Sequence, residues 1–338
     1  MRDRSLKILV AGSGGWGTAL AMTLLENGHE VTLWSYCEEE SRGLRTTLTN
    51  PFLPDVALPE ALCYTSDAAA AEDCDLVVFA TPSFAVRATA RTFKSHLRAD
   101  AVLVSVTKGI EEGSGKRMSE LVAEETGRTV VALSGPSHAE EVSRRIPTGV
   151  VAACADRALA ERVQTAFMNG RLRVYTCTDI VGVELGAALK NVIALCAGVC
   201  DGMGFGDNTK ALLMTRGLAE VARLGMAMGA RRETFAGLAG VGDLIVTCTS
   251  MHSRNRRAGI LIGQGVAVQE TMKRIGAVVE GYYATRSAWE LAKKHDVHMP
   301  ITEAAYDVLY NGADPRSALT RLMQREKTSE EEDDAWAK

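Results

Sequence analysis

The spacing of hydrophobic residues changes near residue 178 and divides the chain into two parts of different kind. Before that point, short runs of β-branched and aliphatic residues alternate with stretches of helical spacing. Runs that are apolar at every position are typical of strands covered on both faces of a parallel sheet. We therefore predict a doubly wound, largely parallel α/β domain. Its predicted strands are 8–11, 31–34, 76–80, 102–106, 130–133, 149–152 and 172–175.

After Asp179 the strand pattern stops and helical spacing dominates. Gly, Asp and Pro bound most of these stretches, as they commonly do at helix ends. The predicted helices are 179–199, 209–228, 253–262, 282–294 and 303–310. We expect an α/β domain over 1–178, an all-helical domain over 179–325, and an acidic, solvated and disordered tail over 326–338.

Composition and charge restrict the classes of function. The 38 Lys and Arg against 42 Asp and Glu give a net charge of −4, so no global attraction to nucleic acid or anionic membrane is expected. An anion site must therefore be local. The chain has no apolar run of spanning length and no signal-peptide start, which predicts a cytoplasmic protein without membrane insertion. Eight scattered cysteines and six histidines without ligand spacing argue against a disulfide framework or a metal site.

A glycine-rich segment follows the first predicted strand and opens a helix. Gly12, Gly14 and Gly17 form G-x-G-x-x-G. The first glycine permits a tight turn, the second lets a pyrophosphate approach the backbone, and the third lets helix and strand pack closely. A turn that serves packing alone is the plainer alternative. The strand before it and the helix after it favour dinucleotide binding by a Rossmann-type domain.

The choice between NAD and NADP stays open. The second strand ends in Trp34-Ser35-Tyr36, with neither the acidic residue that binds a ribose hydroxyl nor an Arg for a 2′-phosphate. Because the acidic residue is missing, we expect NADPH to be accepted at least as readily as NADH. Arg42 or Arg45 is the candidate partner of the 2′-phosphate.

Two loops at predicted strand ends carry polar groups, where open α/β sheets bind ligands. Lys108 follows the fourth strand, and Gly135 and Ser137 follow the fifth. Lys108 could instead be an ordinary solvated side chain. Ser137 with Glu140 could form a capping box, and the two interpretations of that loop are compatible.

Lys190 lies in a nearly all-apolar predicted helix. Its helix face carries only small residues, among them Gly186 and Ala194, which predicts open space around the amine. Burial would lower the pKa of this amine and suit it to act as a general base. The alternative is a Lys that reaches the surface or pairs with Glu184 or Glu220.

Two polar features follow in the helical part. Asp243 stands in a small-residue turn, where it could contribute chemistry or cap a helix. Arg254, Arg256 and Arg257 then bring three guanidinium groups together. Such a cluster can be a solvated helix face, but Arg is also the preferred partner of a phosphate. We predict that this cluster is the local anion site.

These segments together resemble the bacterial type of NAD(P)-dependent glycerol-3-phosphate dehydrogenase. The resemblance is collinear from about residue 7 to residue 310. It rests on the segments 12–21 (GSGGWGTALA), 50–54 (NPFLP), 107–109 (TKG), 133–141 (LSGPSHAEE), 184–191 (ELGAALKN), 240–243 (GVGD) and 253–255 (SRN). It implies a Rossmann domain followed by an all-helical domain, usually as a homodimer. The implied reaction is reduction of dihydroxyacetone phosphate to sn-glycerol 3-phosphate for phospholipid synthesis.

The resemblance also implies roles for individual residues. Lys190 matches the proton acceptor of the family, with Asp243 beside it in the reaction. Substrate contacts are implied for Lys108, Gly135, Ser137, Lys190, Asp243, Ser253, Arg254 and Asn255. Cofactor contacts are implied for Gly12, Gly14, Gly15, Trp16, Gly17, Tyr36, Phe52, Lys108, Ala139, Arg254, Val278 and Glu280. Tyr36 and Phe52 depart from the usual residues, Arg or His and Tyr, which affects the 2′-phosphate contact and removes a hydroxyl near the cofactor.

Two other functions are weighed against this one. A β-hydroxyacid or 6-phosphogluconate-type dehydrogenase also joins a Rossmann domain to a helical one and uses a helix Lys. A dinucleotide-sensing protein without catalysis is the second, but the presence of Lys190, Asp243 and Arg254 argues against it.

Overall fold

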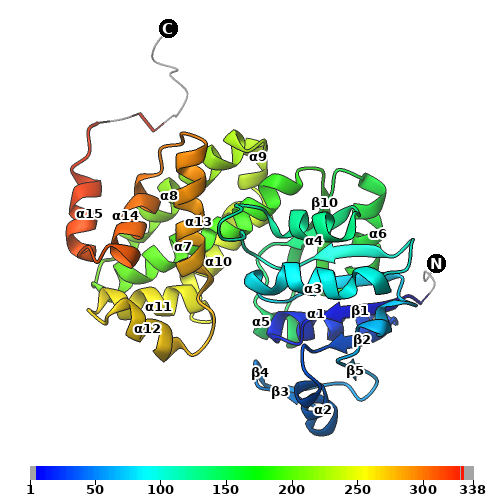
Figure 1. Ribbon diagram of the computed structural model, residues 1–338. Helices are drawn as coiled ribbons and strands as arrows, with labels where there is room; N and C mark the ends of the chain where they lie inside the picture. Colours follow the sequence, from blue (N-terminus) through cyan, green and yellow to red (C-terminus); the bar gives the residue numbers. More distant parts are fainter. Residues whose placement is uncertain (1–4, 328, 331–338) are drawn as a thin grey trace.

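The computed structural model describes residues 5–327 and 329–330, and the described chain folds into a sheet-containing part and a helical part that lie side by side (Figure 1). The predicted acidic tail falls mostly outside the described residues. The division expected after residue 178 lies between the last strand of the sheet, which ends at Cys177, and the long helix that starts at Ile180.

An eight-stranded sheet forms the middle of the first part, as the described residues show. The strands run in the order β10-β9-β8-β7-β6-β1-β2-β5. They pair in parallel except between β8 and β9, which are antiparallel, so the predicted largely parallel sheet is confirmed. The strands are β1 Lys7–Ala11, β2 Glu30–Trp34, β5 Cys63–Thr65, β6 Leu76–Phe79, β7 Val102–Ser105, β8 Val130–Ser134, β9 Thr148–Ala153 and β10 Leu172–Cys177.

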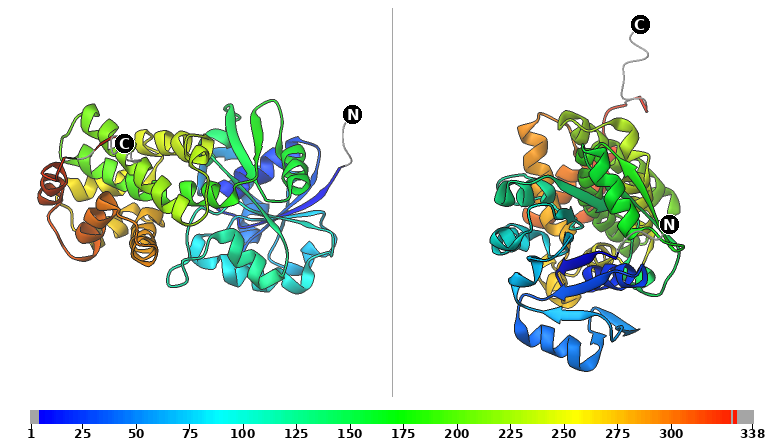
Figure 2. Two further views of the ribbon diagram at one scale, coloured as in Figure 1. Left: turned by 90° about the horizontal axis from the view of Figure 1, so that it is seen from above. Right: turned by 90° about the vertical axis from the view of Figure 1, so that its right-hand side faces the viewer.

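Helices cover both faces of this sheet, which explains why every position of the central strands β6, β7 and β8 is buried (Figure 2). The helices of the first part are α1 Gly15–Glu26, α2 Glu38–Thr47, α3 Val86–Phe93, α4 Met118–Thr126, α5 Ala139–Ser143 and α6 Arg157–Phe167. Short 3₁₀ turns lie at Ala68–Ala71, Ser83–Ala85 and Lys94–His96, and a small hairpin joins β3 Thr49–Asn50 to β4 Leu53–Ala57. Neither the hairpin nor β5 was predicted, because each strand is short or mostly exposed.

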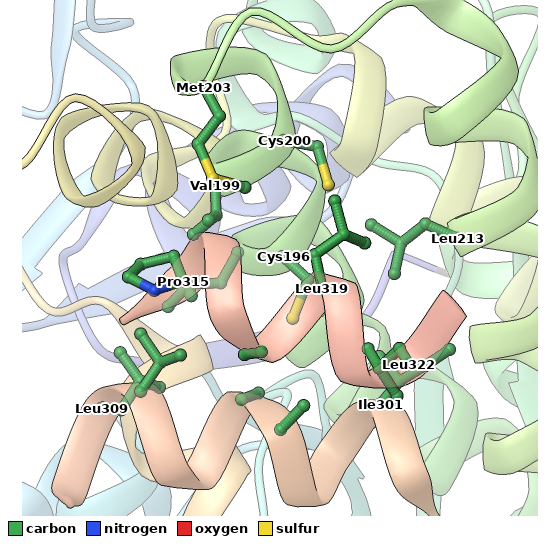
Figure 3. A pocket seen from close by; sticks show the side chains of 15 residues that line it. Cys196, Val199, Cys200, Met203, Leu213, Ile301, Leu309, Pro315, Leu319 and Leu322 are labelled. Carbon is green, nitrogen blue, oxygen red and sulfur yellow. The ribbon is translucent and has the colours of Figure 1, made fainter. Parts of the chain in front are cut away.

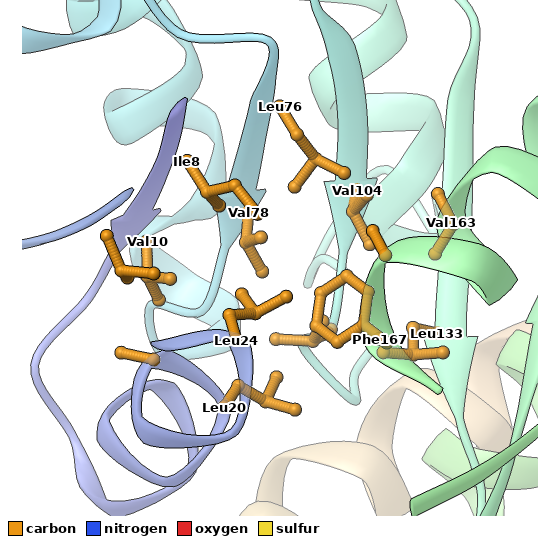
Figure 4. Packing of buried hydrophobic residues seen from close by; sticks show 14 of the residues in the cluster. Ile8, Val10, Leu20, Leu24, Leu76, Val78, Val104, Leu133, Val163 and Phe167 are labelled. Atoms are coloured by element: carbon orange, nitrogen blue, oxygen red, sulfur yellow. The ribbon is translucent and has the colours of Figure 1, made fainter. Parts of the chain in front are cut away.

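Alternate residues of each central strand enter opposite layers of the core. Val10 and Val78 pack with Leu24 and Phe167, from α1 and α6, in the layer shown in Figure 4. Their neighbours in the strands, such as Phe79, pack on the other face against α3 and α4. The two layers hold the carboxyl ends of β1, β6, β7 and β8 along one edge of the sheet.

The second part is helical throughout its described residues. Its elements are α7 Ile180–Gly202, α8 Asp207–Ala227, α9 Arg232–Phe235, a π-helical turn η4 Leu238–Gly242, α10 Asp243–Thr249, α11 Arg254–Gly263, α12 Val268–Ile275, α13 Glu280–Lys294, α14 Pro300–Tyr310 and α15 Pro315–Met323. All five predicted helices are confirmed within a few residues, and the shorter ones were missed. The helix α7 is long and apolar enough to span a membrane. However, 83% of its most apolar 18-residue stretch is buried inside the protein, as expected of a core helix.

An apolar cavity of about 60 Å³ lies between α7, α14 and α15 (Figure 3). Cys196, Met203 and Leu319 are among the side chains around it, and none of its lining residues is charged. It therefore offers no charged group that could bind a phosphate or catalyse proton transfer.

Candidate active site

The glycine-rich loop joins β1 to α1 in a conformation that requires two of its glycines. Gly12 has a φ of +129°, and a Cβ atom there would lie 2.7 Å from the carbonyl of Ala80. A Cβ atom on Gly17 would lie 2.0 Å from the carbonyl oxygen of Gly12. These two glycines therefore let α1 pack closely on the sheet, as the sequence predicts.

Gly14 differs from these two, because a Cβ atom there would meet nothing within 4 Å. It is the N-cap of α1, and no side chain among the described residues caps the first-turn N–H groups. The hydroxyl of Thr81, beside Gly12, is buried without a partner among the described residues. Free donors at a helix N-terminus next to an uncrowded glycine fit the pyrophosphate of a dinucleotide.

Other residues implied by the resemblance border this loop. A Cβ atom on Gly15 would lie 3.2 Å from the backbone of Phe52 and 3.6 Å from Ala139. Trp16 packs in the same region, and its indole N–H is buried without a partner among the described residues. The structure thus brings these residues together around the N-terminus of α1.

Near the end of β2, both candidate arginines are exposed. Ser35 is buried, whereas Tyr36 is 88% exposed. Arg45 donates a 2.6 Å hydrogen bond to the carbonyl of Tyr64 in β5, so one of its guanidinium nitrogens is already engaged. Glu40, which the sequence analysis did not single out, accepts a 2.7 Å hydrogen bond from the hydroxyl of Ser13 in the glycine-rich loop.

Three charged side chains meet where the helical part faces the carboxyl ends of β7 and β8. The Nζ of Lys190, on α7, donates to Oδ1 of Asp243, the first residue of α10. The Nζ of Lys108, in the segment after β7, donates to Oδ2 of Asp243 at 2.9 Å and to the carbonyl of Gly135 at 3.0 Å. One buried carboxylate therefore holds two amines.

This arrangement contradicts two alternatives that the sequence left open. Lys190 pairs with Asp243, so pairing with Glu184 or Glu220 is wrong. Asp243 does not cap a helix either, because it is the first residue of α10 and Gly242 is the N-cap; its two oxygens accept from the lysines instead.

Thr247 is a further partner of Lys190 that the sequence analysis missed. The Nζ of Lys190 donates to Oγ1 of Thr247 at 2.7 Å, and this hydroxyl donates to the carbonyl of Asp243 at 2.6 Å. Positions i and i+4 share a helix face, so the Asp243–Thr247 spacing could have revealed it. That signal required recognising the short helix α10.

Burial controls the electrostatics of this cluster. The side chains of Lys190 and Asp243 are 7% and 1% exposed. Burial lowers the pKa of Lys190 to about 7, although the charge of Asp243 acts in the opposite direction and that of Lys108 adds to the decrease. Burial also lowers the pKa of the neighbouring His138. An amine with this pKa can donate or accept a proton at neutral pH.

The small residues beside Lys190 do not leave the open space that the sequence predicts. A Cβ atom on Gly186 would lie 2.6 Å from the carbonyl of Ala239, so the η4 backbone fills this side of α7. Ala194 is fully buried in the core of the helical part. The small side chains therefore allow α7 to pack closely against η4, which brings Asp243 to Lys190.

The loop after β8 carries Gly135 and Ser137, as predicted, but forms no capping box. The hydroxyl of Ser137 donates to the carbonyl of Gly135 at 2.9 Å, and α5 begins later, with His138 as its N-cap. Gly135 has a φ of +144°. In this turn the carbonyl of Gly135 accepts from both Lys108 and Ser137.

The N-terminus of α11 brings together some, but not all, of the predicted anion-binding residues. Arg254 is exposed, and the buried Ser253 caps the helix by accepting from the N–H of Arg256 at 3.2 Å. Asn255 is buried and donates to the side chain of Asn191 at 2.9 Å. Arg256 instead forms a 2.8 Å ion pair with Asp201, so the prediction of a three-arginine site is wrong in this respect.

Glu280 begins α13 and reaches across to the first part of the chain. Its carboxylate accepts from the hydroxyl of Ser83 at 2.9 Å. Burial raises the pKa of Glu280, while the hydrogen bond from Ser83 and the charge of Arg254 oppose this increase. Arg254 and Glu280 thus lie within electrostatic reach of each other, and Val278 lies just before Glu280 in a partly buried loop.

Comparisons with known proteins agree over nearly the whole chain. Residues 7–160 match the family described as NAD-dependent glycerol-3-phosphate dehydrogenase N-terminus, and residues 179–320 match its C-terminus. A protein of Desulfitobacterium hafniense named glycerol-3-phosphate dehydrogenase [NAD(P)+] is 51% identical over 329 residues, covering 97% of this chain and 94% of its own. A protein of the same name from Geobacillus kaustophilus is 52% identical, covering 96% of each chain.

Solved structures give the same result. The crystal structure of glycerol-3-phosphate dehydrogenase from Coxiella burnetii superimposes with a TM-score of 0.91 at 37% identity, covering 95% of this chain and 99% of that one. The yeast enzyme from Saccharomyces cerevisiae gives a TM-score of 0.82 at 27% identity, covering 95% and 100%.

Proposed function

The chain belongs to the NAD-dependent glycerol-3-phosphate dehydrogenase family, and we propose that it reduces dihydroxyacetone phosphate to sn-glycerol 3-phosphate with NADPH or NADH, and catalyses the reverse oxidation. The observation that carries this proposal is the buried amine of Lys190, held by Asp243 between the two parts of the chain. The product would supply glycerophospholipid synthesis.

The residues around the glycine-rich loop fit the cofactor. Gly12, Gly14 and Gly17 would hold its pyrophosphate at the N-terminus of α1. When bound, NAD(P)H supplies the hydride that adds to C2 of the substrate. Further contacts come from the residues that border this loop or the facing helices, namely Gly15, Trp16, Tyr36, Phe52, Lys108, Ala139, Arg254, Val278 and Glu280.

Lys190 supplies the proton for the same reaction. Reduction turns the C2 carbonyl oxygen into an alkoxide, which needs a nearby proton as its charge develops. The Nζ of Lys190 donates this proton in reduction and accepts it in oxidation. Its pKa of about 7 suits both directions.

Asp243 and Lys108 prepare the site for this transfer. Asp243 orients the amine of Lys190 through one oxygen and binds Lys108 through the other. Lys108 adds a positive charge that stabilises the developing alkoxide.

The phosphate of the substrate is bound at the N-terminus of α11. Arg254 contributes a guanidinium group that is exposed there, and Ser253 and Asn255 flank it. Gly135, which accepts from Lys108, and Ser137, which donates to Gly135, would contribute further substrate contacts. Because guanidinium groups bind phosphate through two hydrogen bonds, Arg254 is expected to provide most of the phosphate affinity.

A spectrophotometric assay tests the proposed function. The purified protein is expected to oxidise NADPH and NADH when dihydroxyacetone phosphate is added. It should not reduce NADP+ or NAD+ when 6-phosphogluconate or another hydroxyacid is added. Lys190→Ala should lower kcat at least about 100-fold, because positioned acid–base catalysis is lost. Lys190→Arg should not restore it, since a guanidinium stays protonated.

Binding measurements separate loss of catalysis from loss of structure. Lys190→Ala should bind NADPH as the wild type does, because the glycine-rich loop lies in the other part of the chain. A folded variant that keeps more than about a tenth of the wild-type kcat would exclude Lys190 as the essential acid–base group.

The remaining proposals concern the state of the protein in the cell. We infer that it works in the cytoplasm as a homodimer. We also infer that its substrates are small molecules and that it does not bind nucleic acid. Sedimentation equilibrium of the full chain is expected to give twice the monomer mass, and fractionation of cells should place the activity in the soluble fraction.

A further inference from the structure

We propose that Arg117 and Glu184 are positioning residues that hold the segment carrying Lys108 at a fixed distance from the helix carrying Lys190. This inference rests on the proposed function and names residues that act on the reaction through the two lysines. Neither residue contacts the reacting groups.

The carboxylate of Glu184 is the fixed point on α7. Its Oε2 accepts from Nη1 of Arg117 and from the hydroxyl of Ser119, each at 2.5 Å, and its Oε1 accepts from the N–H of Ser119 at 2.8 Å. Both oxygens are therefore bound by residues of the sheet-containing part. The side chains of Glu184 and Arg117 are 6% and 11% exposed, so water does not compete for these bonds.

Arg117 is also the far end of the Lys108 segment. This segment leaves the sheet after Ser105 and enters α4 at Met118. It is closed upon itself by a bridge between Ile110 and Arg117 and by a 2.9 Å bond from the N–H of Glu111 to the carbonyl of Lys116. A displacement of Arg117 is therefore transmitted to Ile110 and to the adjoining Lys108.

The same segment is anchored in the core of the helical part. Ile110 is 6% exposed and packs in the cluster that contains Leu185 and Leu189 of α7. The segment thus contacts α7 on both sides of the bridge, through an apolar side chain and through a buried ion pair.

Asp243 makes the spacing of these two elements important for the reaction. Its two oxygens bind the amines of Lys190 and Lys108, so both amines must reach one carboxylate. If α7 and the segment shifted relative to each other, one amine would lose its contact. The charge balance that determines the pKa of Lys190 would then change, because both Asp243 and Lys108 contribute to it.

A matched control exists on the same segment. Glu112 forms a 2.6 Å ion pair with Arg286 of α13, which also joins the two parts, but these side chains are 53% and 41% exposed. An exposed pair contributes little to stability or position. Glu112→Gln therefore also removes one carboxylate charge from a contact between the two parts of the chain. It leaves the buried hydrogen bonds of Glu184 unchanged.

The test compares Glu184→Gln with Glu112→Gln in the full chain, using kcat for dihydroxyacetone phosphate reduction, NADPH binding by fluorescence, and the pH profile of kcat/KM. Glu184→Gln is expected to bind NADPH within about twofold of the wild type, to lose at least tenfold in kcat, and to shift the apparent pKa of the profile by half a unit or more. Glu112→Gln should match the wild type in all three measurements. A purely structural role would lower the melting temperature without moving the pH profile.

Arg117→Lys provides a second variant if Glu184→Gln does not fold. It keeps the positive charge but loses the planar guanidinium group, which contacts Glu184 and Ser119 through Nη1 and Glu120 through Nη2, so a three- to tenfold loss of kcat and a shifted pH profile are expected. A folded variant of either kind with wild-type kcat and an unchanged pH profile would overturn the proposal. Wild-type protein that fails to reduce dihydroxyacetone phosphate would instead remove the proposed function, and this proposal with it.

Discussion

At the scale of single residues, the site depends on a buried carboxylate that binds two amines. Asp243 is 1% exposed, and an isolated charge in such a place would be strongly destabilised. Lys108 and Lys190 compensate it, and Thr247 satisfies a further hydrogen bond of the Lys190 amine. The cluster therefore keeps the pKa of the Lys190 amine near 7 without leaving a buried charge unpaired.

The pKa of Lys190 predicts opposite pH dependences for the two directions of the reaction. Reduction needs the protonated amine, so kcat/KM for dihydroxyacetone phosphate should fall as pH rises through about 7. Oxidation needs the neutral amine, so kcat/KM for sn-glycerol 3-phosphate should rise over the same range. Initial rates measured in both directions between about pH 5.5 and pH 9, a range that brackets this pKa, test the prediction.

The comparison of directions serves as its own control. Ionisation of the substrate phosphate would affect both directions in the same sense, whereas titration of Lys190 affects them in opposite senses. Parallel profiles in the two directions would therefore contradict the assignment of the proton to Lys190.

Arg254 and Arg257 lie on the same helix and provide a matched pair of substitutions. Arg254→Ala should weaken substrate binding by about 2–4 kcal/mol, because the phosphate would lose its charged partner. Arg257→Ala, which changes an exposed side chain, should stay within about 0.5 kcal/mol of the wild type. The KM for dihydroxyacetone phosphate measures both, and equal effects at the two positions would refute the phosphate assignment.

Arg256 gives a different expectation from its neighbours. Its ion pair with Asp201 has side chains that are each 15% exposed, so Arg256→Ala removes a partly buried contact between α11 and α7. The loss should appear in the melting temperature first and in substrate affinity only through the position of α11.

At the scale of elements, the crossing of α7 and α11 determines where the substrate residues lie. A Cβ atom on Gly198 of α7 would lie 2.0 Å from the carbonyl of Arg256, and one on Gly259 of α11 would lie 2.0 Å from the carbonyl of Leu195. The two backbones are therefore in contact, and this close approach brings Asn255 to Asn191. Only glycine permits such a crossing.

Gly198→Ala is expected to separate these helices. The added methyl group cannot be accommodated by side-chain motion, because it meets a backbone carbonyl, so a loss of about 1–3 kcal/mol in the free energy of unfolding is expected. Displacement of α11 should also raise the KM for dihydroxyacetone phosphate. Denaturant unfolding and steady-state kinetics measure the two effects.

Gly43→Ala on α2 is the matched control for this substitution. A Cβ atom there would meet nothing within 4 Å, and the residue is exposed on a helix. Alanine has the higher helix propensity, so Gly43→Ala should stabilise the protein by about 0.5–1 kcal/mol. If both substitutions destabilised the protein equally, close packing of α7 and α11 would not be the cause.

At the scale of the whole molecule, the site is assembled from both parts of the chain. Lys108 and Gly135 come from the sheet-containing part, and Lys190, Asp243 and Arg254 come from the helical part. The contacts between the two parts, including Ser83 with Glu280 and Arg117 with Glu184, hold them together. The proposed cofactor and substrate sites thus lie where the two parts of the chain meet.

Cofactor binding should raise the stability of the whole molecule by mass action. At a concentration of about 100 times Kd, a cofactor adds about 2.7 kcal/mol to the free energy of unfolding. NADPH should raise the melting temperature at least as much as NADH at equal concentration, because β2 is not followed directly by an acidic residue and Arg42 is exposed. Thermal unfolding with each cofactor measures this.

The predicted cofactor preference can be contradicted in the same experiment. A clearly larger shift with NADH, together with a tenfold preference for NADH in kcat/KM, would show that no residue near Tyr36 binds the 2′-phosphate. Glu40, which contacts the glycine-rich loop through Ser13, would then be the acidic residue to substitute.

The sequence by itself determined the features that depend on neighbouring residues. Strand positions, the glycine turn at Gly12 and the long helix around Lys190 follow from hydrophobic spacing and from backbone conformations that only glycine adopts easily. The order of these motifs along the chain also indicated the family, which the comparisons then showed.

Only the tertiary structure decided which distant side chains meet. Asp243 lies 53 residues from Lys190 in the sequence, Glu184 lies 67 residues from Arg117, and Arg256 turned out to pair with Asp201. The short helix α10 and the turn η4, which place Asp243, have too few residues for a clear periodicity. The partner of a charged group depends on how helices pack against one another, and that packing is a property of the folded chain as a whole.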